Sequence, residues 1–518
     1  MAMTEQSSDA ATRRRNALRH PIRWFLNTEP EQPGEIPRKE LTFFGLAHWG
    51  QSSLHSMAGG DRFFHFCTNV LMIKPETVGQ MLGMTTLFDA LNDPVAGAII
   101  DGYRFKDGRK LLPWIKYTSP AIAVVAFLMF VNWNLSAGMT VAYAAMIYIV
   151  WDIFYSFRDA AIWGMTATVS PHSDQRARSS QYADIGAMFG GLLPSLTMPM
   201  LSGGGVFGLN QQQVYFIFAV VLCLGGGFMS LFAMGMNERV RSQPPAKEKG
   251  DRMYAVREFF RNISYLRHNY IILLLLASEV LNALSPTVSD IYIYQQLTYR
   301  VGGREIPAAL LIIIFGAAAQ LPGAALKFFA IKIANRVGGM KRIIIIARVA
   351  NIVTGLLGFL IGIKSVWALA LVQLIDGFNS LPGSLNGIAW RALVGDSVDY
   401  VEWKIGKRTE GITMSVRNFM GKLGNAIRRF VQGYTLVFLQ FDAARVPQNL
   451  PQNAHFQRWI WPAFRLGPVL GLTLSLIPLL LIKFPESLRR QVEAEMMERR
   501  ASAAAQPPFI SENPSRPG

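Results

Sequence analysis

Residues 77–102 read TVGQMLGMTTLFDALNDPVAGAIIDG, a largely uncharged stretch that two aspartates and an asparagine interrupt near its middle. Its length exceeds the roughly 20 residues that an α-helix needs to cross a bilayer. Asp89 and Asp93 are four residues apart and Asn92 is three from Asp89, so all three side chains project from one helix face. A charge at the centre of a membrane helix costs about 2.5–3.5 kcal/mol and marks a functional site. We therefore expect a membrane-spanning helix that carries a polar site.

The rest of the chain has the composition of a membrane protein. Of its 518 residues, 51% are hydrophobic and 16% are charged, against roughly 25% charged residues in an average soluble domain. Charges concentrate in residues 1–40, 237–268 and 485–518, which we expect to be an N-terminal tail, a basic loop and a C-terminal tail. The fold expected between them is all-α, with about twelve membrane-spanning helices in two bundles, residues 41–236 and 269–484.

The helix boundaries expected from the apolar runs are as follows: 43–72, 77–102, 112–134, 138–168, 180–201 and 212–236 in the first bundle, and 269–296, 305–335, 341–363, 366–396, 409–440 and 459–484 in the second. Each run has the length of a membrane span. The first and second bundles are separated by the basic loop.

The net charge of +17 is distributed by loop. Arg and Lys crowd into residues 1–40, 104–110 and 237–268, whereas residues 134–138 and 202–213 contain neither. This alternation follows the positive-inside rule and places both termini in the cytoplasm of a multi-pass inner-membrane protein. A nucleic-acid-binding surface would not skip alternate loops, so we expect contact with the lipid bilayer and none with nucleic acid.

Two further charged residues fall inside expected membrane helices, Asp152 in 138–168 and Lys422 in 409–440. Two carboxylates on one helix face in a low dielectric do not both ionise without compensation. Asp89 and Asp93 therefore share a proton, pair with a basic group such as Lys422, or bind a cation through their oxygen atoms. The alternative is structural: an ion pair that joins helices, or charges that lie at the bilayer surface. We expect H⁺ or Na⁺ as coupling ion, with sodium at Asp89 and Asp93 as the one metal considered, and no cofactor.

Several short motifs resemble those of a known transporter family. They are Asp89–Gly97 with Gly108-Arg109 and Pro113-Trp114 after it, the segment DSVDYVEWK at 396–404, and Lys422-Leu423-Gly424. Together they resemble the signatures of the glycoside–pentoside–hexuronide:cation symporters, whose type member is the melibiose permease. The resemblance implies the major-facilitator fold, with twelve transmembrane helices in two six-helix halves. Turns of glycine and basic residues at 107–110 and 336–342, in corresponding places of the two halves, agree with such a duplication.

The resemblance implies roles for five residues of the expected membrane helices. Asp89, Asn92 and Asp93 match the cation-site positions of the family. Asp152 matches an aspartate that binds sugar hydroxyls, and Lys422 matches a lysine near the cation site. We expect Asp152 and Lys422 to contact the solute.

Other positions depart from the family pattern. Ser52, a further expected solute contact, falls where the family has a sugar-binding aspartate, and Ser156 falls where it has a tryptophan. Ile149 replaces a threonine that helps to bind sodium. The coupling residues are therefore largely kept, whereas the sugar pocket is not. His48, His55 and His65 have no metal-site spacing, and we expect them to serve polar packing.

Charged residues near the ends of the expected helices predict gates that pair when the cavity closes. The expected inner-gate residues are Asp101, Arg109, Asp396, Asp399, Arg408 and Glu410. Arg428 and Arg429, in the outer half of helix 409–440, leave two interpretations open. They line the outer cavity as ligands for a carboxylate-bearing solute, or they close an outer gate by pairing with a carboxylate such as Asp61.

These observations predict a secondary active transporter and not an enzyme. The expected activity is cation-coupled symport of a small polar solute (a glycoside, pentoside or hexuronide) by alternating access in a monomer. One alternative is a protein of the same fold that moves a non-sugar solute such as a lipid or an amino-acid derivative, which the departures at Ser52 and Ser156 keep open. The other is a non-transporting membrane receptor.

Overall fold

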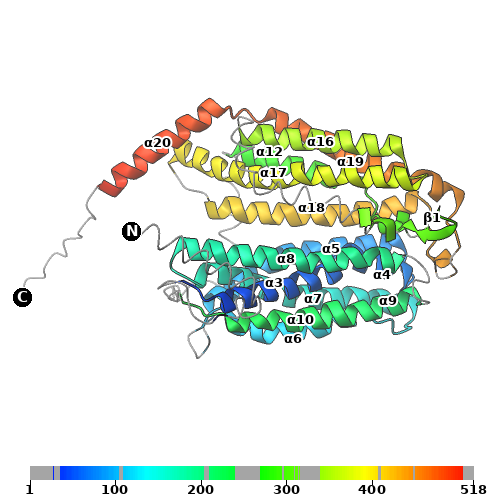
Figure 1. Ribbon diagram of the computed structural model, residues 1–518. Coiled ribbons are helices and arrows are strands. Elements are labelled where there is room, and N and C mark those ends of the chain that lie inside the picture. The colour runs from blue at the N-terminus through cyan, green and yellow to red at the C-terminus, as the bar shows by residue number, and fades with distance from the viewer. Residues whose placement is uncertain are drawn as a thin grey trace, which may run out of the picture.

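Two helical bundles lie side by side in the computed structural model (Figure 1). The structure describes residues 27, 35–103, 105, 109–202, 209–239, 269–294, 297–308, 310–312, 314–315, 339–406, 410–446, 448 and 450–505. The first bundle contains α3 (Arg38–Ala58), α4 (Asp61–Asn69), α5 (Pro75–Gly102), α6 (Leu112–Leu128), α7 (Ala137–Thr168) and α8 (Ser173–Ser202). It ends with a continuous helical rod formed by α9 (Gln211–Phe218), η2 (Ala219–Gly225), α10 (Gly226–Met229) and η3 (Ser230–Gly235).

The second bundle begins with α12 (Tyr270–Ala283) and the single turn α13 (Ile291–Tyr294). An antiparallel hairpin follows, β1 (Thr298–Val301) and β2 (Arg304–Pro307), joined by Gly302 and Gly303 at positive φ. The remaining elements are α16 (Met340–Ile361), α17 (Val366–Ile405), α18 (Glu410–Phe438), η6 (Ala443–Arg445), α19 (Ala454–Leu481) and α20 (Glu486–Ala505). Positions 309, 313 and 316–335 of the expected helix 305–335 lie outside the described residues, and β2 occupies its beginning.

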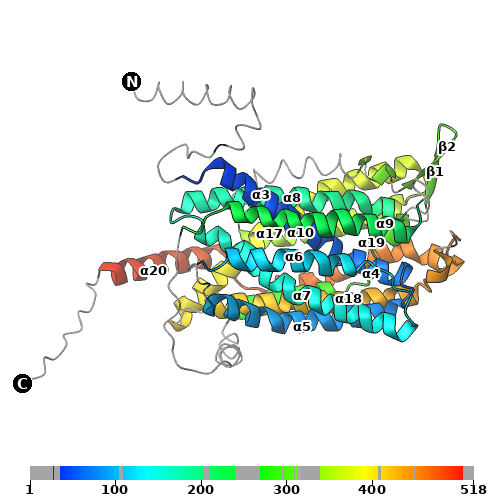
Figure 2. The same ribbon diagram turned by 90° about the horizontal axis from the view of Figure 1, so that it is seen from below.

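Long helices run between two ends of the molecule, which we name by the elements found there. The hairpin end carries α4 and β1–β2, and the α20 end carries α20 (Figure 1). At the junction of the bundles, α18 and α5 lie side by side in both views (Figure 2). These two helices come from different halves of the chain. A change in the relative position of the bundles would therefore change the contacts of the side chains between them.

Four helical segments of the described chain are long and apolar enough to cross a membrane: Ala137–Thr166, Gln211–Gly235, Met340–Ile361 and Ala454–Leu481. Large apolar side chains on them face outward, as Leu360 and Leu480 do, and suit contact with lipid. Helices α5 and α18 are also long, but charged residues interrupt them. Because these two helices face each other at the junction, their polar residues lie between the bundles.

Two expected helices are interrupted in the structure. The expected helix 43–72 breaks between α3 and α4 at Gly59 and Gly60, because glycine loses the most backbone freedom on entering a helix. This break places Asp61 at the first turn of α4. The expected helix 269–296 is interrupted after α12, where Pro286 cannot donate a helical hydrogen bond.

The apolar core is continuous between the bundles at the hairpin end but divided at the α20 end. One cluster joins Phe63 and Tyr215 of the first bundle to Tyr292 and Leu436 of the second. Towards the α20 end, separate clusters fill the first bundle around Leu112 and the second around residues such as Ile344. The bundles are thus packed together at the hairpin end.

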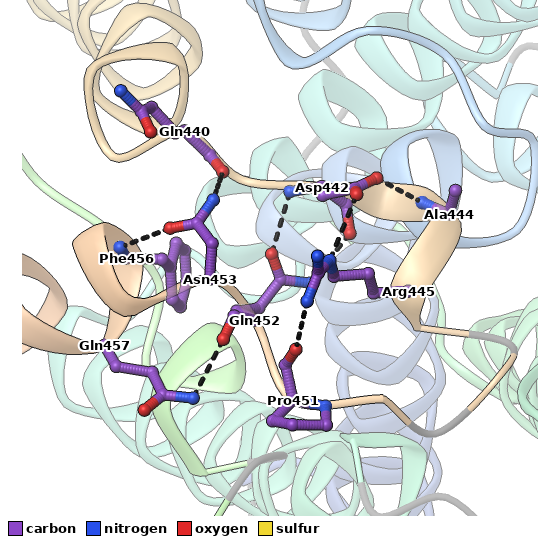
Figure 3. Close-up of polar contacts among 9 residues, drawn as sticks. All are labelled: Gln440, Asp442, Ala444, Arg445, Pro451, Gln452, Asn453, Phe456 and Gln457. Carbon is purple, nitrogen blue, oxygen red and sulfur yellow. Dashed lines mark hydrogen bonds and ion pairs between the residues drawn. The ribbon is translucent and has the colours of Figure 1, made fainter.

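Side-chain hydrogen bonds stabilise the connection between α18 and α19 at the hairpin end (Figure 3). Gln452 accepts from the backbone N–H of Asp442 at 2.8 Å and donates to the carbonyl of the same residue at 2.7 Å. Asn453 caps α19 by accepting from the N–H of Phe456 at 2.8 Å and donates to the carbonyl of Gln440 at 2.7 Å. The end of α18 is therefore held in a defined position.

The segment expected to be a C-terminal tail contains α20. Val492 and Met496 of this helix are buried, and the indole of Trp403 at the end of α17 donates to Glu495 Oε2 at 2.6 Å. The helix is otherwise polar, so hydropathy did not reveal that one of its faces packs on the second bundle.

Candidate cation and solute site

A lysine of the second bundle lies between two aspartates of the first. Lys422 Nζ on α18 is 2.5 Å from Asp89 Oδ2 and 2.5 Å from Asp93 Oδ2, both on α5. The exposed fractions of the side chains are 22% for Lys422, 17% for Asp89 and 44% for Asp93. The ion pairs therefore sit at the junction of the bundles with partial access to water.

Helix α7 adds a third carboxyl group and a hydroxyl to this centre. Asp152 is buried and its side chain contacts that of Asp89. Ser156, one turn later, donates to Asp89 Oδ1 at 3.3 Å and accepts from Asn92 Nδ2 at 3.5 Å. Among the described residues, Asp152 Oδ2 has no hydrogen-bond partner. Three carboxyl groups thus meet one ammonium group, an arrangement that leaves negative charge for a cation to compensate.

Oxygen atoms dominate this centre, as hard cations prefer. No group of three or more His, Cys, Asp and Glu side chains in the described part of the chain is arranged to hold a metal ion. The Lys422 ammonium instead occupies the space between the two carboxylates. Any cation that binds Asp89 and Asp93 must therefore displace or release Lys422.

Aromatic side chains form a wall beside Asp152. The ring of Tyr155 stacks on that of Trp151 at 5.0 Å between centroids and on that of His55 at 4.8 Å. Asp159 Oδ1 accepts from the Tyr155 hydroxyl at 3.0 Å and from Gln51 Nε2 at 2.8 Å. Flat rings next to oriented polar groups suit a solute with both apolar and hydroxyl faces.

The structure brings together five of the residues predicted from sequence: Asp89, Asn92, Asp93, Asp152 and Lys422. Ser52 is half-buried on α3 and lies beside Gly190 of α8, so its contact with solute stays a prediction. His55, which was expected to serve polar packing, is exposed and stacks on the aromatic wall. Sequence reasoning missed Tyr155 and treated Ser156 only as a departure.

Closure of the hairpin end involves an ion pair between the bundles. Arg429 Nη1 of α18 is 2.5 Å from Asp61 Oδ1 of α4 and donates to Gln432 Oε1 at 3.3 Å. Thr68 of α4 shares a 2.8 Å hydrogen bond with the hydroxyl of Tyr292. We call these contacts the hairpin-end gate. Arg429 thus makes the ion pair that one of its two interpretations requires, and its role in gating stays a prediction.

Arg428 behaves differently from its neighbour. It lines a cavity of about 410 Å³ together with Asn282, Asn351 and Gln432, and Asp61 forms one edge of that cavity. Among the described residues, Arg428 makes no hydrogen bond or ion pair, and its side chain is exposed. The two arginines thus separate into an ion-paired residue and a cavity residue.

Three of the predicted inner-gate residues, Asp396, Asp399 and Arg109, lie towards the α20 end. Asp396 and Asp399 are on the last turns of α17, and Arg109 is exposed just before α6. Arg408 and the side chains of Asp101 and Glu410 lie outside the described residues. The gating role of all six stays a prediction.

Comparison with known proteins decides the family. A model of the family described as "MFS/sugar transport protein" matches residues 53–486. The chain belongs to this family. The resemblance found from the short motifs is thereby confirmed, as is the major-facilitator fold.

Relatives of this sugar-transport family member cover most of its length. The uncharacterized symporter YjmB of Bacillus subtilis (strain 168) is 27% identical over 90% of this chain and 96% of its own. A raffinose carrier protein of Pediococcus pentosaceus is 26% identical over 83% of this chain and 67% of its own. A putative sulfoquinovose importer of Salmonella typhimurium is 24% identical over 78% of this chain and 81% of its own.

Solved structures agree on the fold. A bacterial homologue of the human lysosomal transporter Spinster, in an inward-facing conformation, superposes with a TM-score of 0.55 at 14% identity, covering 89% of this chain and 97% of that one. The nucleoside transporter NupG superposes with a TM-score of 0.51 at 13% identity, covering 86% of this chain and 98% of that one. Together with the family match over residues 53–486, this fold makes the protein an integral membrane transporter and not an enzyme.

Proposed function

We propose that this protein is a cation-coupled symporter of a sugar-like solute, active as a monomer in the cell's inner membrane with both termini in the cytoplasm. In that topology the hairpin end faces outward and the α20 end faces the cytoplasm. The observation that carries the proposal is the position of Lys422 between Asp89 and Asp93. This contact joins the two bundles through charges that a cation can replace.

Coupling follows from the charge count at the junction. With Asp89, Asp93 and Asp152 ionised, Lys422 compensates one of three negative charges. A proton or sodium ion at the α5 carboxylates compensates a second and frees the Lys422 ammonium. Because an uncompensated charge is costly to enclose away from water, the loaded centre can be occluded more readily than the empty one. The bundles then change from opening on one side of the membrane to opening on the other only when the cation is bound.

The solute is proposed to bind beside this centre, against Trp151, Tyr155 and His55. The buried Asp152 would accept hydrogen bonds from solute hydroxyls at the edge of the aromatic wall, and Asp159 and Gln51 supply further polar groups. Since Asp152 also contacts Asp89, a solute that engages it changes the balance of charge at the cation site. This shared residue is the proposed link between solute and ion.

The conformation described is proposed to be the inward-facing state. The gate contacts and the continuous core close the hairpin end. Alternating access would require the Asp61–Arg429 pair to separate while charges at the α20 end, such as Asp396, Asp399 and Arg109, come together.

Arg428 favours an anionic sugar over a neutral one. Arg428 lines the 410 Å³ cavity that Asp61 also borders, among amide groups that suit hydroxyls. A putative sulfoquinovose importer is among the relatives, and an acid group on a sugar would suit an arginine. A hexuronide is therefore the favoured solute class, with neutral glycosides and pentosides as the alternatives to be tested.

Uptake into proteoliposomes tests the proposal. A panel of neutral sugars, uronates and amino-acid derivatives is offered under imposed H⁺ and Na⁺ gradients, each separately. We expect Asp89→Asn and Asp93→Asn to abolish gradient-driven uptake while the protein stays inserted. Asp174→Asn, an exposed carboxylate in the first turn of α8, is the matched control and should keep wild-type uptake.

Each outcome separates the alternatives. Uptake of a non-sugar solute alone would support the same fold with a different cargo. No flux of any solute in either direction would favour a receptor. Gradient-driven uptake that survives both α5 substitutions would remove Asp89 and Asp93 from the coupling site.

A further inference from the structure

A cavity of about 330 Å³ opens at the α20 end of the second bundle, far from the cation and solute site. Its wall is built from the first two turns of α16, the segment that joins α19 to α20, the first turn of α20 and the last third of α17. Both α16 and α19 are among the segments apolar enough to span a membrane. The cavity therefore lies where the membrane interior meets the aqueous phase.

Basic side chains dominate the polar part of this cavity. Lys341, Arg342, Lys483 and Arg489 line it with one carboxylate, Asp396, so four positive charges face one negative charge. The first residues of α16 line the same space, and no side chain caps the helix at its N-cap residue Gly339. A helix N-terminus carries partial positive charge and binds anions. The cavity is thus suited to an anionic group.

Two of the four cations are available to a ligand. Lys341 Nζ donates to the carbonyl of Ile482 at 2.6 Å, and Arg489 pairs with Glu493 at 3.2 Å. Arg342 and Lys483 are exposed, and neither side chain has a hydrogen bond or ion pair with the described residues. Lys341 and Arg489 are held in place by their partners, whereas Arg342 and Lys483 leave their positive charges available to a ligand in the cavity.

The remainder of the wall is apolar and continues along the membrane. Ile345, Leu393 and Phe484 line the cavity. Beyond it, α16 presents a stripe of exposed apolar side chains at helical spacing: Ile346, Val349, Val353, Leu357 and Leu360. A ligand with a charged head and apolar chains would place the head in the cavity and its chains along this stripe.

We propose that this cavity binds the phosphate headgroup of an anionic phospholipid of the inner leaflet. Basic pockets at the cytoplasmic membrane boundary are suited to such headgroups. The bound lipid joins α16, α19 and the base of α20, and its phosphate lies near Asp396. This inference rests on the cavity and on the proposed cytoplasmic position of the α20 end, and it does not depend on the identity of the transported solute.

Thermal unfolding of the purified full-length protein tests the site. Phosphatidylglycerol, phosphatidylcholine and inorganic phosphate are added in separate arms, and the midpoint is followed with concentration. Each basic side chain near a membrane surface contributes about 1 kcal/mol to anionic-lipid binding, so Arg342→Gln with Lys483→Gln should weaken phosphatidylglycerol binding by about 30-fold. Unchanged unfolding in phosphatidylcholine shows that the variant is folded.

The matched control removes two exposed charges from the opposite end of the molecule. Arg300→Gln with Arg458→Gln makes the same change in net charge near the hairpin end and should keep wild-type phosphatidylglycerol binding. Equal loss in both double variants would mean a non-specific charge effect and would overturn the site. Stabilisation by inorganic phosphate alone, or none by phosphatidylglycerol, would overturn the lipid assignment.

Discussion

Breaking the Asp61–Arg429 pair should open the hairpin end. The two side chains are 2.5 Å apart, with exposed fractions of 53% for Asp61 and 18% for Arg429. Exposed pairs contribute about 0.2–1 kcal/mol and loss of one partner of a buried pair costs about 3–5 kcal/mol. For this half-exposed pair we take about 1–2 kcal/mol, which corresponds to a shift of about 5- to 30-fold towards the open state.

Cysteine labelling measures this shift without knowledge of the solute. The two native cysteines, Cys67 and Cys223, are both fully buried, so the background is low. A reporter introduced as Ser289→Cys lies in the cavity that Asp61 edges. In intact cells, a membrane-impermeant maleimide should label it about 5- to 30-fold faster when Arg429→Gln is added. Arg458→Gln, exposed at the same end, is the control.

A double-mutant cycle decides whether the pair itself is responsible. Asp61→Asn should accelerate labelling as Arg429→Gln does, and the combination should add little. Unchanged labelling in the single variants, or fully additive effects, would refute the gate. The charge reversal Asp61→Arg with Arg429→Asp should restore slow labelling if the attraction alone is important.

Backbone contact supports the same closed state by another route. A Cβ atom at Gly433 of α18 would lie 2.7 Å from the carbonyl oxygen of Pro75 and 3.1 Å from Cα of Gly79 on α5. Gly433→Ala should therefore also speed labelling at the hairpin end. Gly421→Ala, on the same helix with nothing within 4 Å of the added carbon, should leave the rate unchanged.

The remaining predictions concern coupling, stability and pH. Lys422→Met should reduce net gradient-driven uptake by about tenfold while exchange of solute persists, because the α5 carboxylates lose the group that helps to release the cation; equal loss of both would contradict this role. Arg465 makes two 2.9 Å bonds to Asp376 inside the second bundle, and Arg465→Leu should destabilise the protein by about 3 kcal/mol in reversible unfolding, whereas removal of both partners should cost less. The hydrogen bond from Trp403 lowers the pKa of Glu495. The stabilisation that this bond gives to α20 docking is therefore complete at pH values above the ordinary pKa of a glutamate, and it is lost as the pH falls through the lowered pKa. Hydrogen exchange of α20 should show that Trp403→Phe weakens docking at neutral pH and flattens its dependence on pH, because the difference in Glu495 pKa between the docked and undocked states is then largely removed.

The membrane architecture could be read from local features of the chain. Apolar length, loop charge and the spacing of Asp89, Asn92 and Asp93 are properties of neighbouring residues, and each has a direct physical meaning in a bilayer. The same features identified Lys422 as a candidate partner, because an intramembrane charge requires compensation. Two features were missed: the helix break at Gly59–Gly60 and the packed helix α20. Hydropathy reports neither where a helix ends nor that one face of a polar helix packs on a bundle.

Only the tertiary structure decided which of several chemically reasonable partners meet. Adjacent residues Arg428 and Arg429 carry the same charge, yet Arg429 contacts Asp61 and Arg428 lines a cavity, because helix rotation points them in different directions. Likewise, His55 lies on the aromatic wall with Trp151 and Tyr155, residues about a hundred positions away. A residue's type determines what compensation it needs in a membrane, but the packing of distant helices determines what supplies it.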